Sequence, residues 1–306
     1  MASLKELAKQ GEKFLGGHRA CAGCGATIVA RQVLLAAQYP VVVGAATGCL
    51  EVISTIFPYS AWNVPYVHNA FENVAATMSG VEAAYNALKK KGKINKDLRF
   101  IAFGGDGGTY DIGLQSLSGM IERRHRVLYV CYNNEAYMNT GIQRSSATPY
   151  GAHTTTSPAG TKIPGKLQAR KNLTEIIIAH EPAYAAQATI GYWNDLVTKV
   201  RKALDADGPS FINTYSPCRL GWAYPPEKTA AITRLAVETC VWPLYEYENG
   251  KYRITVKPKE KKPVAEFLKM QGRFGHLFKL EDDTLIKNFQ EEVDRIWQRL
   301  LKRSTE

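Results

Sequence analysis

The sequence predicts an α/β fold in which a mostly parallel sheet carries helices on both faces. Short runs of β-branched and other apolar residues alternate with longer stretches of helical pattern along most of the chain. These short runs are continuously apolar instead of alternating with polar residues, which is typical of strands buried on both faces of a parallel sheet. The length of 306 residues is enough to bury a large core.

The expected elements follow one another in a regular order. The predicted strands are residues 41–44, 100–103, 127–130 and 211–215. The predicted helices are about residues 26–37, 71–91, 111–124 and 192–205. Asp111 stands at the start of the third helix, where we expect its side chain to cap the free backbone N–H groups. No internal repeat is present in the sequence.

Two later segments depart from this rhythm. Residues 139–170 are rich in Thr, Ser, Gly and Pro, and a loop of this length within a compact domain favours a functional role. Past residue 235 the sequence predicts a hairpin with its turn at Asn249-Gly250 and an amphipathic helix over 281–303. This segment packs either on a partner subunit, which we favour, or back on its own domain. The division is an α/β domain over residues 1–235 and a C-terminal arm over residues 236–306.

Composition narrows the class of protein. Apolar residues make up 45% and charged residues 22%, as in an ordinary globular protein. The formal net charge of +11 is spread along the chain, which favours acidic protein partners over nucleic acid, for which a basic patch or known module is needed. The charged first residues and the lack of an apolar run of about 18 residues predict a cytoplasmic protein without a membrane span.

Four of the six cysteines stand in loop-like settings next to glycine or proline. They are Cys21 and Cys24 in Cys-Ala-Gly-Cys, Cys49 in Thr-Gly-Cys, and Cys218 in Ser-Pro-Cys. Four thiolates complete the protein shell of a [4Fe–4S] cluster. A zinc ribbon would require a second close pair, and a thioredoxin-like dithiol would leave two of the four unexplained, although zinc stays open as an alternative.

The glycines beside these cysteines, Gly23, Gly25 and Gly48, are expected to let the backbone approach a cluster closely. The other two cysteines differ in setting. Cys131 lies in a strand-like run and Cys240 in a helix-like stretch near Trp242, so both are expected to be inert buried thiols.

A second motif lies between the cysteines. The predicted strand at 100–103 leads into Gly-Gly-Asp-Gly-Gly at 104–108, and the next strand leads into Asn133-Asn134. Both motifs therefore reach the carboxyl edge of the sheet, where α/β proteins bind ligands. The Asp106 carboxylate and an Asn amide oxygen suit Mg²⁺, which prefers hard oxygen ligands together with phosphate. This spacing resembles that of a thiamine diphosphate and Mg²⁺ site.

Together these residues resemble the β subunit of 2-oxoacid:ferredoxin oxidoreductases, the pyruvate synthase group. The resemblance extends over about residues 18–225. It includes His18-Arg-Ala-Cys-Ala-Gly-Cys-Gly25, Ala46-Thr-Gly-Cys-Leu-Glu51, Phe71-Glu-Asn73, Gly104-Gly-Asp-Gly-Gly108 and Asn134-Glu-Ala-Tyr-Met-Asn-Thr-Gly141.

The resemblance implies a thiamine-diphosphate-binding fold and a role for each matching residue. The implied ligands of a [4Fe–4S] cluster are Cys21, Cys24, Cys49 and Cys218. The implied Mg²⁺ ligands are Asp106, the side chain of Asn134 and the backbone carbonyl of Ala136. The implied cofactor-binding positions are Gly48, Cys49, Asp106, Gly107, Asn134 and Ala136. Asn139 matches a catalytic asparagine near the reactive carbon of the thiazolium ring, although an asparagine that only satisfies the loop backbone is the alternative reading.

The activity implied is the reversible, coenzyme A-dependent oxidative decarboxylation of a 2-oxo acid, with pyruvate favoured and electrons passed to ferredoxin. An α-type subunit would complete the thiamine site, and γ- and δ-type subunits or a ferredoxin domain would carry electrons onward. Oxalate (without coenzyme A), 2-oxoisovalerate, 2-oxoglutarate and indolepyruvate are alternative substrates. A non-redox thiamine-dependent decarboxylase subunit and a metal-stapled nucleic-acid-binding protein are the alternatives from other classes.

Overall fold

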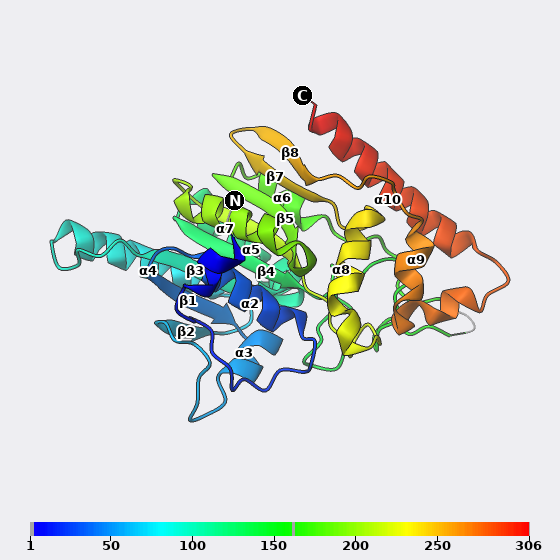
Figure 1. Cartoon of the computed structure of the whole chain (residues 1–306), viewed down its shortest axis with the longest axis horizontal. Helices are drawn as coiled ribbons and strands as arrows, with labels where there is room; N and C mark the ends of the chain where they lie inside the picture. Colours follow the sequence, from blue (N-terminus) through cyan, green and yellow to red (C-terminus); the bar gives the residue numbers. More distant parts are fainter. Residues whose placement is uncertain (1–2, 161–162, 306) are drawn as a thin grey trace.

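The computed structural model describes residues 3–160 and 163–305, and it contains an eight-stranded sheet at the centre of the molecule (Figure 1). The strand order is β2-β1-β3-β4-β6-β5-β7-β8. The strands are β1 (Val41–Ala46), β2 (Tyr66–Asn69), β3 (Arg99–Gly105), β4 (Val127–Asn133), β5 (Tyr184–Thr189), β6 (Ser210–Tyr215), β7 (Leu244–Glu248) and β8 (Lys251–Val256). The first six pair in parallel, so the predicted mostly parallel sheet is confirmed.

The four predicted strands all form, and two further parallel strands were not predicted. The first, β2, is only four residues long and lies at the edge of the sheet. The second, β5, has the sequence Tyr-Ala-Ala-Gln-Ala-Thr, whose Ala and Gln residues carry little β-propensity. Its six residues are nevertheless buried between β6 and β7, so tertiary packing decides its conformation.

Helices cover both faces of the sheet. Helices α2 (Gly25–Ala36) and α7 (Trp193–Asp205) pack on one face, and α4 (Val74–Lys90), α5 (Leu114–Glu122) and α6 (Leu173–Ile178) pack on the other. Alternate residues of β3 therefore enter different cores. Ile101 and Phe103 pack with α2 and α7, whereas Phe100 and Ala102 pack with α4 and α5. The remaining short elements are α1 (Leu4–Ala8), α3 (Cys49–Ser54) and single turns of 3₁₀-helix at 190–192 and 226–228.

The predicted helix over 111–124 is wrong at its start. A π-helix occupies Gly107–Ile112, and α5 begins only at Leu114. The carboxylate of Asp111 does not cap a helix. It accepts hydrogen bonds from the hydroxyl of Tyr137 at 2.9 Å and from the backbone N–H of Ser146 at 3.2 Å. Asp111 therefore fastens the loop that follows β4 to the π-helix that follows β3.

Residues 236–306 extend the main sheet and its core. Strand β7 pairs antiparallel with β5, and the turn between β7 and β8 is Asn249-Gly250, both with positive φ, as expected for the predicted hairpin. Helices α8 (Thr229–Glu238), α9 (Val264–Lys269) and α10 (Thr284–Arg303), with the 3₁₀ segment Gly272–Phe278, pack around Trp222 and Trp242. Of the two packings considered for this segment, the structure has it against its own domain, with α10 lying along one side of the molecule (Figure 1).

None of the helices within the described residues is both long enough and apolar enough to span a membrane.

Candidate functional site

The predicted oxygen ligands and Gly48 meet at the carboxyl edge of the sheet. Gly48 follows β1, Asp106 follows β3 and Asn134 follows β4, and these three strands are direct neighbours. Gly105 and Tyr132 are paired in register, so the chain leaves both strands at the same level. Parallel pairing thus brings together residues that lie far apart in the sequence.

The Asp106 carboxylate is buried, with 1% of the residue exposed. One oxygen accepts the backbone N–H of Asn134 at 3.1 Å, and the other accepts the hydroxyl of Ser145 at 2.6 Å. Burial raises the pKa of Asp106 to about 7, although the bonds from Ser145 and Asn134 oppose this shift. A buried carboxylate of this kind is stabilised in its charged form by a cation at its side.

The side-chain amide of Asn134 faces two acceptors. Its outer atom lies 2.9 Å from Oδ1 of Asp106 and 2.8 Å from the carbonyl oxygen of Ala136. With nitrogen at that position, the amide would donate to both. With oxygen there, three oxygens converge on one point, which is electrostatically favourable only around a cation. The donor set of one carboxylate, one amide and one backbone carbonyl fits Mg²⁺.

A cleft lies beside these three residues. Its lining residues are Thr47, Gly48, Cys49, Phe71, Gly105, Asp106, Gly107, Gly108, Tyr132, Asn134, Ala136, Tyr137, Met138, Asn139 and Thr140. Tyrosines explain two of its glycines, because a Cβ at Gly48 would lie 2.6 Å from the hydroxyl of Tyr132, and one at Gly107 would lie 2.5 Å from the ring of Tyr137. Asn139 is exposed at this cleft.

The loops that carry Cys24 and Cys218 are in direct contact. The backbone N–H of Gly25 donates to the carbonyl of Pro217 at 3.2 Å, and a Cβ on Gly25 would lie 2.8 Å from that oxygen. Gly23 has a φ of 73° and accepts a hydrogen bond from the Thr229 hydroxyl at 2.9 Å. Gly23 and Gly25 thus make room for the backbone of neighbouring loops. In this structure they allow close packing between loops of the chain itself.

The four predicted cluster cysteines influence one another electrostatically. Cys21 is exposed, and the other three are partly buried. Burial raises the pKa of Cys49 to about 12, and the negative charges of Cys218, Cys24, Asp106 and Cys21 add to this shift. Burial also raises the pKa of Cys218, whereas the backbone N–H groups of Gly221 and Leu220 oppose it. Burial therefore favours the neutral thiols of Cys49 and Cys218, and a cationic centre beside them would favour their thiolate forms.

Among residues 3–160 and 163–305, no three His, Cys, Asp or Glu side chains are grouped closely enough to hold one ion. The ligands of a cubane stand further apart, because each thiolate binds a different iron. The choice between a cluster and zinc therefore rests on the sequence pattern of the four cysteines.

The remaining cysteines are buried, as expected. Cys131 lies within β4 with no exposed surface, and Cys240 is 2% exposed. The setting expected for Cys240 is wrong, because it follows the end of α8 and has a φ of 58°.

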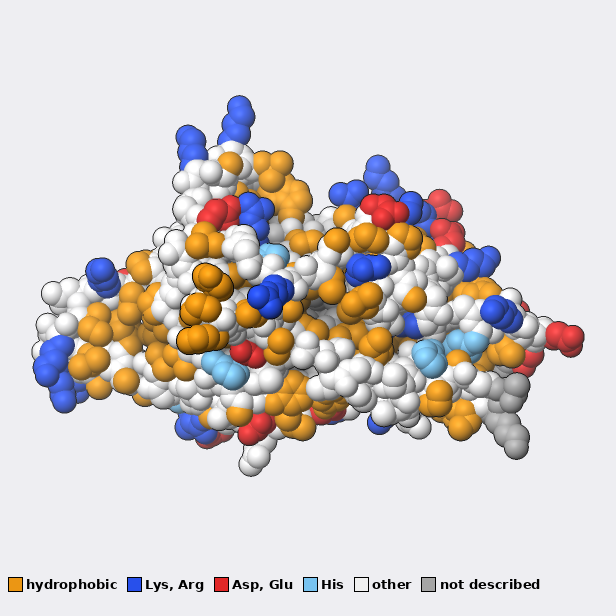
Figure 2. All heavy atoms as spheres, turned by 90° about the horizontal axis from the view of Figure 1, so that it is seen from below, with side chains coloured by type: hydrophobic (Ala, Val, Ile, Leu, Met, Phe, Trp, Pro, Cys, Tyr) orange, Lys and Arg blue, Asp and Glu red, His pale blue; other side chains and the backbone are white. Residues whose placement is uncertain are grey.

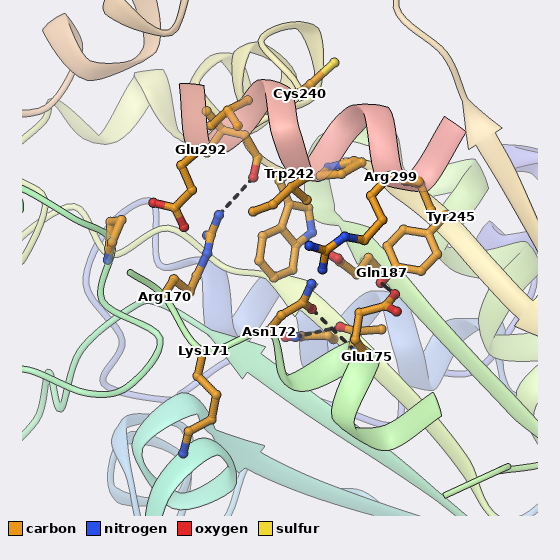
Figure 3. A pocket seen from close by; sticks show the side chains of 18 of the residues that line it. Arg170, Lys171, Asn172, Glu175, Gln187, Cys240, Trp242, Tyr245, Glu292 and Arg299 are labelled. Atoms are coloured by element: carbon orange, nitrogen blue, oxygen red, sulfur yellow. Dashed lines mark hydrogen bonds between the residues drawn. The ribbon is translucent and has the colours of Figure 1, made fainter. Parts of the chain in front are cut away.

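A separate cavity lies between α10 and the sheet, beside Arg170, Trp242 and Arg299 (Figure 3). Its volume of about 70 Å³ is well below the roughly 300–1,000 Å³ of small-molecule sites. We therefore place no ligand in it.

Two residues that contribute to the site were not predicted from the sequence. Ser145 lies in the long loop that was expected to be functional, and its hydroxyl holds Asp106. Glu135 lies between two implied Mg²⁺ ligands and is fully buried. The sequence signal for Glu135 was an acidic residue type within the stretch Asn-Asn-Glu-Ala at 133–136, but its partners come from distant segments.

The fold and this edge of the sheet define a thiamine diphosphate-binding domain. Residues 46–214 match the family described as thiamine pyrophosphate enzyme, C-terminal TPP binding domain. The fold is shared with a solved chain of 2-oxoglutarate:ferredoxin oxidoreductase from Magnetococcus marinus, with a TM-score of 0.57 and 20% identity over 68% of this chain and 66% of that chain.

Curated relatives narrow the thiamine diphosphate-binding proteins to one family. "Pyruvate synthase subunit PorB" of Thermotoga maritima is 58% identical over 98% of this chain and 95% of the relative. The subunit of the same description from Methanocaldococcus jannaschii is 56% identical over 92% and 94%. "Ketoisovalerate oxidoreductase subunit VorB" of Pyrococcus abyssi is 47% identical over 95% and 93%. The chain belongs to the family of thiamine-dependent β subunits of 2-oxoacid:ferredoxin oxidoreductases.

Proposed function

We propose that this chain is the thiamine- and [4Fe–4S]-carrying subunit of an enzyme that oxidatively decarboxylates pyruvate. Coenzyme A would take the acyl group and ferredoxin the electrons, and the reaction would be reversible. The preference for pyruvate rests on the relatives at 58% and 56% identity, which are described as pyruvate synthase subunits.

The observation that carries this proposal is the place of Cys49. It lines the same cleft as Asp106 and Asn134, and it also interacts electrostatically with Cys21, Cys24 and Cys218. A cluster bound by these cysteines would therefore lie beside the thiamine site. A non-redox decarboxylase has no use for such a neighbour, so this placement favours electron transfer over the non-redox alternative.

Within this site, the chain's own residues bind and orient. Asp106, the Asn134 amide and the Ala136 carbonyl would hold the Mg²⁺ that joins the diphosphate to the protein. Gly48 and Gly107 would let the backbone approach the phosphates, and Asn139 would face the reacting carbon. When bound, thiamine supplies the electron sink for decarboxylation.

The rest of the active site would come from an α-type subunit, and γ- and δ-type subunits or a ferredoxin domain would carry electrons onward in the cytoplasm. Exposed apolar side chains next to α3 suit such a contact, since Phe57 is 93% and Tyr59 75% exposed. Figure 2 shows hydrophobic side chains spread around a hollow on the face seen from below. Residues 236–306 would add a further partner surface through their outward side.

A second substrate is supported by one observation. The relative described as a ketoisovalerate oxidoreductase subunit is 47% identical across nearly the whole chain. Relatives that share this scaffold are therefore named for different 2-oxo acids. Turnover of the assembled complex with pyruvate, 2-oxoisovalerate, 2-oxoglutarate, indolepyruvate and oxalate distinguishes them. Preference for any acid other than pyruvate would overturn the pyruvate assignment and leave the class of reaction intact.

The split site has its own test. The purified chain, loaded with cluster and cofactor, is assayed for 2-oxo acid-dependent reduction of a viologen dye. We expect no turnover without the partner subunits and full turnover on reconstitution, because the group that activates thiamine would lie on the partner. Robust turnover by the chain alone would refute the split site.

A further inference from the structure

Glu135 occupies an unusual position between Asn134 and Ala136. Its φ is 65°, in the left-handed region that disfavours residues other than glycine, and its side chain has no exposed surface. A charged side chain is costly to bury without partners, and a left-handed backbone persists only where its surroundings enforce it. Both features point to a role for this residue.

Two arginines from distant segments hold the Glu135 carboxylate. Nη1 of Arg170 donates to Oε1 at 2.6 Å, and Nη2 of Arg273 donates to Oε2 at 2.5 Å. Arg273 lies 4.0 Å above the ring of Trp222, and Arg170 lies beside the ring of Trp242. Each guanidinium is therefore fixed by an aromatic plane as well as by the carboxylate. Figure 3 shows Arg170 with its hydrogen bond to the carbonyl of Val241.

The backbone of the same turn is also held on every side. The carbonyl of Asn134 accepts the indole N–H of Trp222 at 2.8 Å, and the carbonyl of Glu135 accepts the hydroxyl of Thr148 at 2.6 Å. The N–H of Glu135 donates to the side chain of Asn133 at 3.0 Å. On the other side of the turn, the backbone N–H of Asn134 donates to Asp106 at 3.1 Å, and the outer atom of the Asn134 side-chain amide lies 2.9 Å from Asp106 and 2.8 Å from the carbonyl oxygen of Ala136.

We infer that Glu135, clamped by Arg170 and Arg273, is a positioning residue that presents Asn134 and Ala136 to the cation bound with thiamine diphosphate. The inference rests on the proposed function. Because its left-handed conformation reverses the chain, Glu135 can point away from the cleft while its two neighbours point into it. The clamp also makes the C-terminal segment, through Arg273, part of the support of the site.

The test measures cation affinity in the assembled complex after removal of Mg²⁺ and cofactor. Mg²⁺ is titrated at fixed thiamine diphosphate, with binding followed by calorimetry, for the unaltered protein and for Glu135→Gln, Arg273→Gln and the double variant. Second-sphere partners of a metal site change affinity by about 10–100-fold, so each single variant should raise the apparent Kd for Mg²⁺ at least about tenfold. The double variant should have about the same Kd for Mg²⁺ as the single variant that binds more weakly, since both substitutions remove the same contact between Glu135 and Arg273.

A matched control separates positioning from general stability. Glu246 is another buried carboxylate held by two cations, Lys202 at 2.8 Å and Arg253, but it lies in β7 away from the cleft. Glu246→Gln should lower the melting temperature and leave the Kd for Mg²⁺ unchanged. The electron paramagnetic resonance spectrum of Mn²⁺ bound in place of Mg²⁺ should change in Glu135→Gln and stay the same in Glu246→Gln, because it reports ligand geometry.

The outcomes are distinct. If Glu135→Gln does not fold, the milder Arg273→Lys replaces it, with a weaker loss of affinity expected because lysine lacks the planar fork. If the unaltered complex binds Mg²⁺ and the Glu135 and Arg273 variants bind it equally well, the positioning role is refuted and the proposed function stands. If the unaltered complex shows no Mg²⁺-dependent binding of thiamine diphosphate, the proposed function and this inference fail together.

Discussion

Substitution of Gly25 by alanine tests how the cysteine loops are held together. A Cβ at this position would lie 2.8 Å from the carbonyl oxygen of Pro217, 2.8 Å from the carbonyl carbon of Ser216 and 2.9 Å from the nitrogen of Pro217. All three contacts are with backbone, which cannot rotate away as a flexible side chain can. The loop that carries Cys24 must therefore move away from the loop that carries Cys218.

The size of the effect follows from these contacts. Overpacking in a closely packed region costs about 1–3 kcal/mol. The hydrogen bond from the Gly25 N–H to Pro217, now 3.2 Å, is lost as the loops separate, at about 0.5–1.5 kcal/mol. Because this strain falls between Cys24 and Cys218, we expect incomplete cluster assembly in the Gly25→Ala variant, with iron well below about four per chain.

The assay is iron content and visible absorbance after anaerobic purification. Gly80→Ala is the matched control, because Gly80 lies within α4 and a Cβ there would meet no atom within 4 Å beyond its chain neighbours and the adjacent backbone of its own helix. This control should keep its iron and gain up to about 1 kcal/mol of helix stability. A Gly25→Ala protein with the full iron content and unchanged absorbance would refute this account of the two loops.

Three further predictions concern the cofactors. Cys49→Ser should lose the cluster, measured as iron per chain, whereas Cys131→Ser should retain it because Cys131 is buried within β4; a single zinc in the unaltered protein would contradict both expectations. Asp106→Ala should abolish Mg²⁺-dependent binding of thiamine diphosphate, and Asn134→Ala should weaken it less, since only a neutral ligand is lost; equal affinity in Asp106→Ala, measured by calorimetry, would exclude the assigned cation site. Asn139→Ala should lower kcat more than it weakens cofactor binding, and normal kcat in the reconstituted complex would favour a purely structural asparagine.

The sequence by itself determined the residue types of the site and the edge at which they lie. Asp106 and Asn134 each follow an apolar run, and parallel strands end at a common edge, so their proximity could be predicted from spacing alone. The hairpin at Asn249-Gly250 was equally predictable, because its turn depends on local backbone preference. The turn could be predicted because it depends on residues close together in the sequence. The common edge could be predicted because parallel strands follow a general rule of sheets.

Only the tertiary structure decided what supports these residues. Strand β5 has weak propensity and forms because β6 and β7 enclose it. Only glycine fits at position 25, because the backbone of Pro217, far along the chain, lies against it. No local sequence pattern predicts that contact. Glu135 meets Arg170 and Arg273 only after the loop and the C-terminal segment have folded onto the sheet. Such contacts depend on the packing of segments that are distant in sequence. The partners of a buried charge, and the backbone that lies against a glycine, are brought near only by the fold.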